Sequence, residues 1–178
     1  MKIAISGTSG GFGKYAKEQW EGSNEVVRVN LRNSLEEIVN VVEDCDVFLN
    51  HAYSKDTKQS DVFFDVFNLW LNENKTIINF GTSAILEDGA FSPKYVANKK
   101  HLINLAQTLN QSNPHKKVRV VNFNPGTLEN NKMFGNDFNK LKFKDLFEIV
   151  DFILKLDNSV EISDIVIKNT TQKVKSAI

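Results

Sequence analysis

Cysteine, arginine and long apolar runs are scarce in this chain of 178 residues. The single cysteine, Cys45, excludes an internal disulfide and suits a reducing compartment, although a buried structural thiol would explain it equally well. No apolar run has the length of a transmembrane helix. Arginines are few beside many Lys, Asn, Ile and Phe residues, a bias typical of an AT-rich genome and not a functional signal.

The chain also lacks an excess of charge of either sign, since 22 Lys and Arg residues balance 22 Asp and Glu residues. This balance gives no electrostatic case for binding nucleic acid or an anionic membrane, and it favours a small-molecule partner. No linker, repeat or low-complexity tract divides the sequence, so we expect one domain over residues 1–178. The first expected strand begins at residue 2, which leaves no room for a leader peptide, and we therefore expect a cytoplasmic protein.

The opening of the chain combines a short apolar strand, a glycine-rich turn and helix-forming sequence. The strand covers Ile3–Ile5 and the turn covers Ser6–Gly13. Glycines permit close approach of the backbone, and the start of a helix presents unpaired N–H groups and a positive dipole to an anion. The opening therefore indicates a phosphate-binding site, with a glycine-rich turn that binds no ligand as the alternative.

The spacing of the glycines distinguishes among nucleotide-binding motifs. A Walker loop would need glycine at Thr8 and serine or threonine at Tyr15, so it is excluded. The common dinucleotide fingerprint fits formally from Gly11 to Ala16, but the strand ends near Ser6, which is too early. The remaining spacing, Ser/Thr-Gly-x3-Gly-x-Gly, is met by Ser6, Gly7, Gly11 and Gly13.

Strand and helix patterns alternate along the rest of the chain. Further strands are expected at Glu25–Asn30, Asp46–Asn50, Thr76–Phe80, Lys117–Phe123 and Val160–Ile167. Helices are expected from Gly11 to about Glu21, at Leu35–Val42 after an Ser34 cap, at Ser60–Asn74, from Pro93 to about Asn110, and at Phe143–Leu156. This alternation predicts an α/β fold, namely a doubly wound, Rossmann-like parallel sheet of six strands in the order 2-1-3-4-5-6, with helices on both faces.

The expected helix Ser60–Asn74 carries apolar residues around most of its circumference. So wide an apolar girdle needs two burial surfaces. We assign one surface to the sheet and the other to a second subunit, and we therefore expect a homodimer or a higher homo-oligomer.

Small and polar residues follow the ends of four expected strands. They are Gly7, Asn50–Ala52, Thr82–Ser83 and Pro125–Gly126. In a doubly wound sheet, ligands bind beyond the carboxyl ends of the strands, where the strand order reverses. We expect these four segments to line one cleft.

Tyr95 and Lys99 lie four residues apart, on one face and near the start of an expected helix. A phenol normally ionises near about pH 10, but a neighbouring cation favours the phenolate and brings it within range of proton transfer at neutral pH. The Tyr-x3-Lys pattern is common by chance. Here the pattern follows a strand that ends in hydroxyl residues, and its helix is expected to point to the same cleft as the glycine turn. This context argues against a chance occurrence.

Taken together, these motifs resemble the short-chain dehydrogenase/reductase family over nearly the whole chain. Beside the glycine turn and Tyr-x3-Lys, Asp46–Ala52 is similar to the family's strand ending in Asn-Asn-Ala-Gly, and Ile77–Ser83 resembles its hydroxyl-bearing strand. Asn124–Thr127 matches its Pro-Gly turn beside the nicotinamide, and Val160–Thr170 resembles its closing strand. The resemblance implies an NAD(P)-dependent oxidoreductase that reduces a carbonyl or oxidises an alcohol on a small molecule.

The resemblance also implies roles for individual residues. Tyr95 would be the general acid/base, and Lys99 would hold the nicotinamide ribose and lower the pKa of the tyrosine. A hydroxyl would orient the substrate carbonyl; the family's usual spacing leads to Thr82, while Ser83 is one residue short, and both remain candidates. The implied cofactor contacts are Gly7, Thr8, Ser9, Gly10, Gly11, Phe12, Gly13, Asn30, Arg32, Asn50, His51, Ala52, Lys99, Pro125, Gly126 and Thr127.

The sequence departs from the family pattern in three places. Only one strand and one helix separate the first helix from Asp46, where the family usually has two of each, so we expect a shortened adenine side. Asn30 replaces the acidic residue that binds the ribose hydroxyls, and Arg32 follows closely, which favours NADP over NAD. The family's catalytic asparagine would fall near Lys55–Thr57, where no asparagine stands, and Asn68 lies too far along its helix.

These departures keep a second function open, a non-catalytic protein that binds NAD(P)H as a sensor or regulator. The intact Tyr-x3-Lys pair favours the enzyme. His51 and His101 have no metal-ligand spacing, so we expect no metal site. The segment Lys132–Lys144 stands where the family keeps its mobile substrate lid, with an ordinary surface loop as the alternative.

Overall fold

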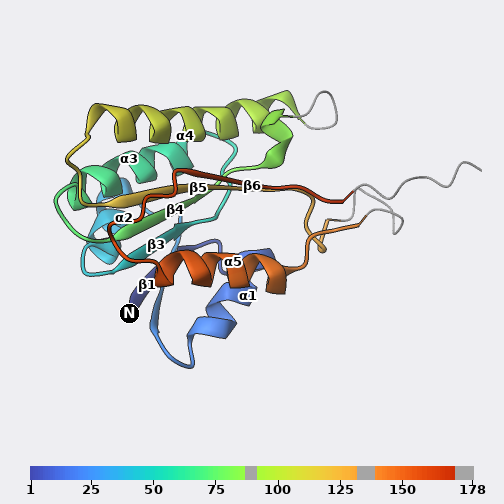
Figure 1. Ribbon diagram of the computed structural model, residues 1–178, viewed down its shortest axis with the longest axis horizontal. Helices are drawn as coiled ribbons and strands as arrows, with labels where there is room; N and C mark the ends of the chain where they lie inside the picture. The colour runs from blue at the N-terminus through green and yellow to red at the C-terminus, as the bar shows by residue number, and fades with distance from the viewer. Residues whose placement is uncertain (87–91, 132–138, 171–178) are drawn as a thin grey trace, which may run out of the picture.

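A computed structural model describes residues 1–86, 92–131 and 139–170 as one α/β unit (Figure 1). Its strands are β1 (Lys2–Ser6), β2 (Glu25–Val29), β3 (Val47–Asn50), β4 (Thr76–Phe80), β5 (Arg119–Pro125) and β6 (Asp164–Ile167). Its helices are α1 (Gly11–Trp20), α2 (Leu35–Val42), α3 (Lys58–Trp70), α4 (Pro93–Ser112) and α5 (Phe143–Lys155), with a short 3-10 helix, η1 (Ser83–Leu86).

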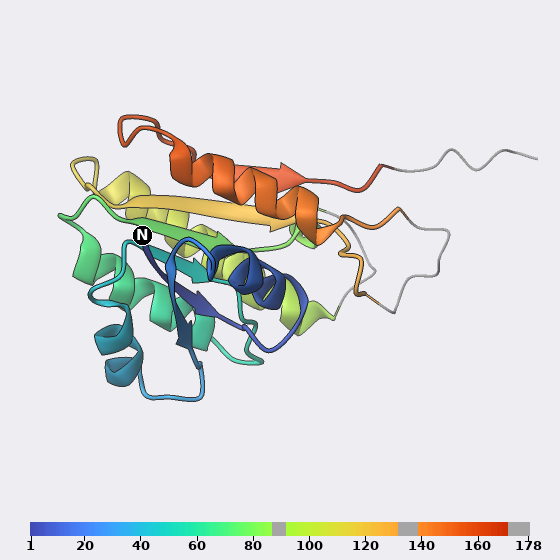
Figure 2. The ribbon, with the colours of Figure 1, turned by 90° about the horizontal axis from the view of Figure 1, so that it is seen from below.

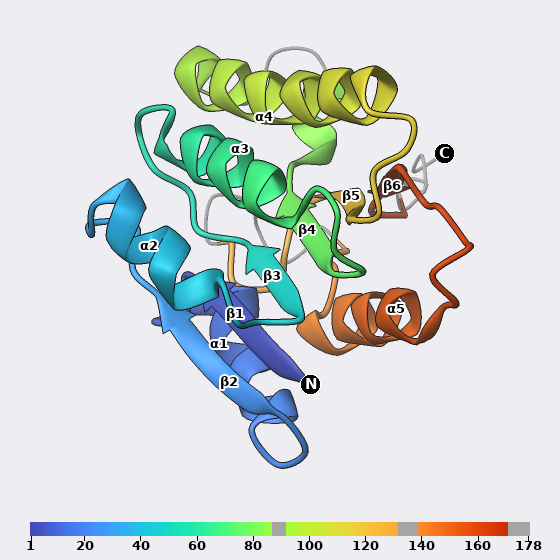
Figure 3. The same ribbon diagram turned by 90° about the vertical axis from the view of Figure 1, so that its left-hand side faces the viewer.

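The strands form a six-stranded sheet in the order β2-β1-β3-β4-β5-β6, and every neighbouring pair is parallel. This confirms the predicted topology. Helices α2, α3 and α4 cover one face of the sheet, and α1 and α5 cover the other (Figure 3). Between β1 and β3 the chain forms only α1, β2 and α2, so the expected shortened connection is present.

Alternating side chains of the central strands divide the interior into two cores, because successive residues of a strand point to opposite faces. In β1, Ala4 packs toward α2, α3 and α4, whereas Ile3 and Ile5 pack toward α1 and α5. Figure 2, seen from below, shows α1 and α5 lying across their face of the sheet. Burial on both faces explains why the strands read as continuous apolar runs.

Three elements differ most from the sequence-based prediction: the last strand, α3 and β5. Strand β5 covers Arg119–Pro125 instead of Lys117–Phe123, so Pro125 ends the strand and does not follow it. The last strand begins at Asp164 instead of Val160, because residues 157–160 form a turn in which Val160 N–H donates to the Asp157 carbonyl oxygen at 3.0 Å. Helix α3 starts at Lys58 and ends at Trp70, where the Glu73 N–H returns to the Trp70 carbonyl oxygen at 2.9 Å. The start of β6 and the end of α3 are set by local turn hydrogen bonds, which the apolar periodicity of the sequence does not reveal.

The apolar girdle of α3 is covered within one chain. The helix packs between α2 and α4 and against the sheet (Figure 3), and Val62, Phe63, Phe67 and Trp70 are buried there. Only Phe64, 42% exposed, remains a large exposed apolar side chain of this helix. The inference that the girdle needs a second subunit was therefore wrong in its reasoning, because it counted the sheet and omitted the two flanking helices. A homodimer stays a prediction that this helix does not support.

Within the described residues, no helix combines the length and the apolar character needed to cross a membrane.

Arg119, the first residue of β5, ties this strand to the end of α5. It is 7% exposed, and its guanidinium donates to the carbonyl oxygens of Ile153 at 2.8 Å, Leu156 at 3.1 Å and Asp157 at 3.1 Å. The last carbonyl groups of a helix have no partner within the helix and carry its negative dipole end, so a cation placed there stabilises them.

Replacing Arg119 with Met should therefore lower the free energy of unfolding by about 2–3 kcal/mol, because one buried and two partly buried carbonyl groups lose their charged donor. Urea denaturation followed by circular dichroism measures this change. Arg28→Met, a matched change at an exposed position of β2, should stay within about 0.5 kcal/mol of the parent. Equal losses in the two variants would contradict the capping role of Arg119.

Candidate functional site

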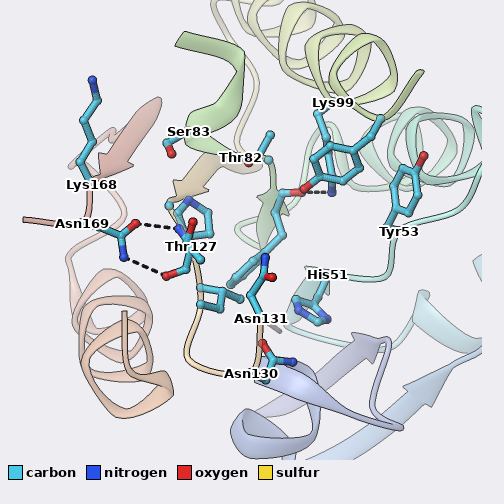
Figure 4. Close-up of a pocket in the computed structure, with 16 residues that line it drawn as sticks. His51, Tyr53, Thr82, Ser83, Lys99, Thr127, Asn130, Asn131, Lys168 and Asn169 are labelled. Carbon is cyan, nitrogen blue, oxygen red and sulfur yellow. Dashed lines mark hydrogen bonds between the residues drawn. The ribbon is translucent and has the colours of Figure 1, made fainter. Parts of the chain in front are cut away.

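The carboxyl ends of all six strands meet at one edge of the sheet, and two clefts open there. The central cleft has a volume of about 690 Å³ and lies beyond β4, β5 and β6 (Figure 4). The outer cleft, about 1130 Å³, lies beyond β1, β2 and β3. Tyr53, in the segment after β3, lines both clefts. The four segments predicted to share one cleft thus border two adjoining ones.

The glycine turn after β1 is held tightly against the loop after β3. The φ of Gly7 is +80°, a backbone conformation that favours glycine. A Cβ at Gly13 would collide with the Gly7 carbonyl oxygen, so the turn and the first turn of α1 are in direct contact. The Ser6 hydroxyl oxygen accepts the N–H groups of His51 and Ala52, each at 2.9 Å. These contacts fix two loops that are distant in the sequence.

The start of α1 carries the features of an anion site. Its N-cap, Gly10, supplies no side-chain hydrogen bond to the first turn, so this helix end relies on other partners for its N–H groups. Gly7, Thr8 and Ser9 line the outer cleft next to it. The side chain of Phe12 is buried instead, stacked on Phe80 with ring centroids 4.9 Å apart. Phe12 therefore supports the turn from the core.

Basic residues surround the outer cleft. Its lining includes Arg28, Arg32, Lys55 and Lys58, with Asp56 as the one acidic residue among the lining residues that are described. Asn30 also lines it. The Asn30 side-chain oxygen accepts the Arg32 N–H at 3.1 Å, so it shapes the turn that presents Arg32.

Tyr95 and Thr82 meet at the wall of the central cleft. Burial raises the pKa of the Tyr95 phenol above its usual range, and a hydrogen bond with Thr82 offsets part of this rise. The ring packs edge-on against Tyr53, with centroids 4.9 Å apart. Ser83 also lines the cleft, but the hydroxyl that acts on the Tyr95 pKa is that of Thr82. The expectation that the tyrosine pKa is lowered was wrong for this arrangement, because desolvation outweighs the other effects.

Lys99 is buried beside these rings. Its ammonium donates to the Gln59 side-chain oxygen at 2.9 Å and to the Phe80 carbonyl oxygen at 2.5 Å. It lies 6.0 Å from the Tyr95 ring centroid, so it faces the ring. Burial lowers the pKa of Lys99 to about 7, because the charged form loses its hydration.

His51 lines the central cleft (Figure 4) and lies next to the glycine turn and to Phe80. Burial, followed by the charge of Lys99, lowers the pKa of His51 to about 4, so its imidazole is neutral at neutral pH. The ring packs on Phe80 at 5.0 Å and on Phe12 at 5.9 Å between centroids. Among the described residues, no group of three or more His, Cys, Asp or Glu side chains could hold a metal ion.

The Pro125–Gly126–Thr127 turn lines the central cleft as predicted. Asn169, which follows β6, holds this turn in place: its side chain accepts the Thr127 N–H at 2.7 Å and donates to the Thr127 carbonyl oxygen at 2.9 Å (Figure 4). The turn requires glycine at position 126, because a Cβ there would collide with the Asn169 side chain.

Asn50 lies apart from the other predicted contacts. Its side chain is fully buried, donates to Asn79 at 2.9 Å and to the Gln59 carbonyl oxygen at 3.1 Å, and lines neither of the two clefts. Of the predicted substrate lid Lys132–Lys144, residues 132–138 lie outside the described part of the chain.

Sequence reasoning missed Gln59, Asn169 and Tyr53. Gln59 lies two residues after Thr57, the end of the segment Lys55–Thr57 where the family's asparagine would fall. Its side-chain amide was the one signal in the sequence, and it was overlooked because only asparagine was sought there. Asn169 lies in the stretch Val160–Thr170 and Tyr53 follows Asp46–Ala52, but neither residue was singled out there, since their roles come from loops that approach one another only in the folded chain.

No family model and no curated protein sequence matches the chain. Solved structures do match. Alcohol dehydrogenase from the archaeon Thermococcus sibiricus, complexed with 5-hydroxy-NADP, is 18% identical with a TM-score of 0.75, over 98% of this chain and 99% of that one. Serine dehydrogenase from Escherichia coli is 17% identical with a TM-score of 0.74, over 94% and 97%. A short-chain dehydrogenase/reductase from Vibrio parahaemolyticus is 14% identical with a TM-score of 0.71, over 95% and 100%.

These similarities extend over almost the whole of each chain, while the sequences have diverged widely. The resemblance first read from the glycine turn, the Tyr-x3-Lys pair and the Pro-Gly turn is therefore confirmed at the level of the fold: this chain has the fold of the short-chain dehydrogenases and reductases of known structure.

Proposed function

We propose that the chain is an NAD(P)-dependent oxidoreductase that reduces a carbonyl or oxidises an alcohol on a small molecule. The observation that carries the proposal is the convergence of Thr82, Tyr95 and Lys99 on a cleft that adjoins the glycine turn. A proton donor, a hydroxyl partner and an ammonium in one cavity form the minimal set for proton transfer to a carbonyl oxygen.

The two clefts fit a dinucleotide. The glycine turn and the uncapped start of α1 would hold the pyrophosphate, the outer cleft would hold the adenosine half, and the Pro125–Thr127 turn would border the nicotinamide. The bound cofactor would supply or accept the hydride. The 5-hydroxy-NADP bound to the Thermococcus alcohol dehydrogenase, a protein of similar fold, supports a dinucleotide as the ligand.

Tyr95 is suited to donate a proton. Since burial raises its pKa, the phenol stays protonated at neutral pH, and this is the form that can donate a proton to a carbonyl oxygen. Thr82 bonds to the phenol and would orient the same carbonyl oxygen. Lys99 would place positive charge behind the ring and contribute an N–H group to the nicotinamide ribose.

The basic outer cleft supports a preference for NADPH. The outer cleft beside Asn30 is lined by four cations: Arg28, Arg32, Lys55 and Lys58. A 2′-phosphate bound in this cleft would meet these cations, and Asn30 would not repel it as a carboxylate would. A homodimer in the cytoplasm remains part of the proposal as an expectation from the sequence.

Tyr95→Phe should lower kcat for carbonyl reduction by about 10²–10⁴-fold, because the proton donor is lost, while the Kd of NADPH should scarcely change. Stopped-flow turnover and fluorescence titration measure the two quantities. Tyr15→Phe removes the hydroxyl of a ring that packs against α5, and it should leave kcat and the Kd of NADPH unchanged. Full activity in Tyr95→Phe would refute the mechanism, and NADPH binding without turnover of any carbonyl by the parent would favour the non-catalytic alternative.

Gly13→Ala should weaken NADPH binding by about tenfold or more, because the added Cβ displaces the Gly7 carbonyl and distorts the turn that would hold the pyrophosphate. Isothermal calorimetry measures the Kd. Gly22→Ala adds the same methyl group at a remote site with open space around it and serves as the control. An unchanged Kd in Gly13→Ala would place the pyrophosphate elsewhere.

Arg32→Ala should raise the Kd of NADPH by about tenfold through loss of a charge-assisted contact and leave that of NADH unchanged. Here NADH is the internal control, because it lacks the 2′-phosphate. A parent that binds NADH more tightly than NADPH, with no effect of Arg32→Ala, would overturn the preference.

A further inference from the structure

Gln59, the second residue of α3, forms a buried link between three elements. It is 5% exposed. Its side-chain nitrogen donates to the carbonyl oxygens of Asn50 at 2.8 Å and Phe80 at 3.4 Å, and its side-chain oxygen accepts the Lys99 ammonium at 2.9 Å. One amide thus joins the ends of β3 and β4 to a lysine of α4.

These partners fix the orientation of the amide. Turning it over would place the NH2 group against the Lys99 ammonium and the oxygen against two carbonyl oxygens, so that every contact would become repulsive. The Gln59 backbone is held too, because its carbonyl oxygen accepts the Asn50 side chain at 3.1 Å, and Asn50 also donates to Asn79. The oxygen that faces Lys99 therefore has a set position.

The contact between Gln59 and Lys99 determines which way the remaining N–H group of Lys99 points. An ammonium has three N–H groups, and within the described residues one goes to Gln59 and one to the Phe80 carbonyl oxygen. The third is left on the side of the cleft, where the rings of Tyr53 and Tyr95 lie with centroids 5.7 and 6.0 Å from the nitrogen.

We propose that Gln59 is the positioning residue for Lys99, an amide that holds the ammonium against β4 and aims its third N–H group into the central cleft. The inference rests on the proposed function, because it assigns to Lys99 a role in the cleft. Gln59 itself touches neither substrate nor cofactor in this role; it acts through Lys99.

The contact also bears on the charge of the lysine. Burial lowers the pKa of Lys99 to about 7. Hydrogen bonds to the charged form of a group favour that form, and the two oxygens that accept from the ammonium are neutral. The titratable groups that face Lys99 among the described residues are Tyr53, Tyr95 and His51, and none of them is a carboxylate. The Gln59 oxygen is therefore one of two described groups that favour the charged form.

Two substitutions at this position should shift the lysine in opposite directions. Gln59→Met keeps the length of the side chain and removes the acceptor, so the pKa of Lys99 should fall by about one pH unit. Gln59→Glu keeps an oxygen toward Lys99 and adds negative charge, so the pKa should rise above that of the parent. Gln111→Met and Gln111→Glu make the same changes at an exposed position near the end of α4 and should shift nothing.

The experiment is an NMR titration of the ¹⁵N-labelled lysine side chains without cofactor or substrate, with the Lys99 signal assigned by its loss in Lys99→Met. Retention of the dispersed amide spectrum shows that each variant is folded. In the turnover assay, Gln59→Met should lower kcat/KM about 10- to 100-fold by displacing Lys99, and the Lys99-dependent limb of the pH profile should move with the pKa.

The outcomes separate the two proposals. If the parent turns over no carbonyl, the proposed function fails, while the titration still tests the contact. An unchanged Lys99 pKa in Gln59→Met, or shifts of the same sign in Gln59→Met and Gln59→Glu, would overturn the inference. A shifted pKa with an unchanged kcat/KM and pH profile would overturn it as well, because Gln59 would then be structural only.

Discussion

Burial of the Lys99 ammonium is the constraint on which the arrangement of the cleft depends. An unpaired buried charge costs several kcal/mol, so the fold must bring acceptors to it or keep it neutral. The chain does both in part: α3 supplies the Gln59 oxygen, β4 supplies the Phe80 carbonyl oxygen, and the remaining penalty appears as the lowered pKa. Moving α3 or α4 away from the end of β4 would break these bonds, so the bonds add to the apolar packing that holds both helices there.

The two clefts differ in the chemistry that they offer. The outer cleft surrounds its contents with solvent-accessible cations, which suits a phosphate-bearing ligand at modest cost because the charges stay hydrated. The central cleft is built from aromatic rings, hydroxyls and one desolvated ammonium, where electrostatic effects are stronger. Tyr53, 41% exposed, stands at the boundary and belongs to both.

Much of the fold could be predicted from the sequence, because alternating strand and helix patterns restrict the topology of a parallel sheet to few choices. The glycine turn, Tyr95 and the Pro-Gly turn could also be placed at one edge, since each follows a strand or opens a helix. The rest could not be predicted. The coverage of α3 by α2 and α4, the rise in the Tyr95 pKa and the contact of Gln59 with Lys99 depend on how distant elements pack, and desolvation has no signature in a linear pattern.

The Ser6 hydroxyl, which accepts the N–H groups of both His51 and Ala52, has a consequence for affinity. Loops that must be ordered when a ligand arrives subtract the cost of that ordering from the binding free energy. Here one hydroxyl at the end of β1 already immobilises the segment after β3 beside the glycine turn. The floor of the site is thus preorganised, and a ligand that settles on it does not bear the cost of ordering this loop.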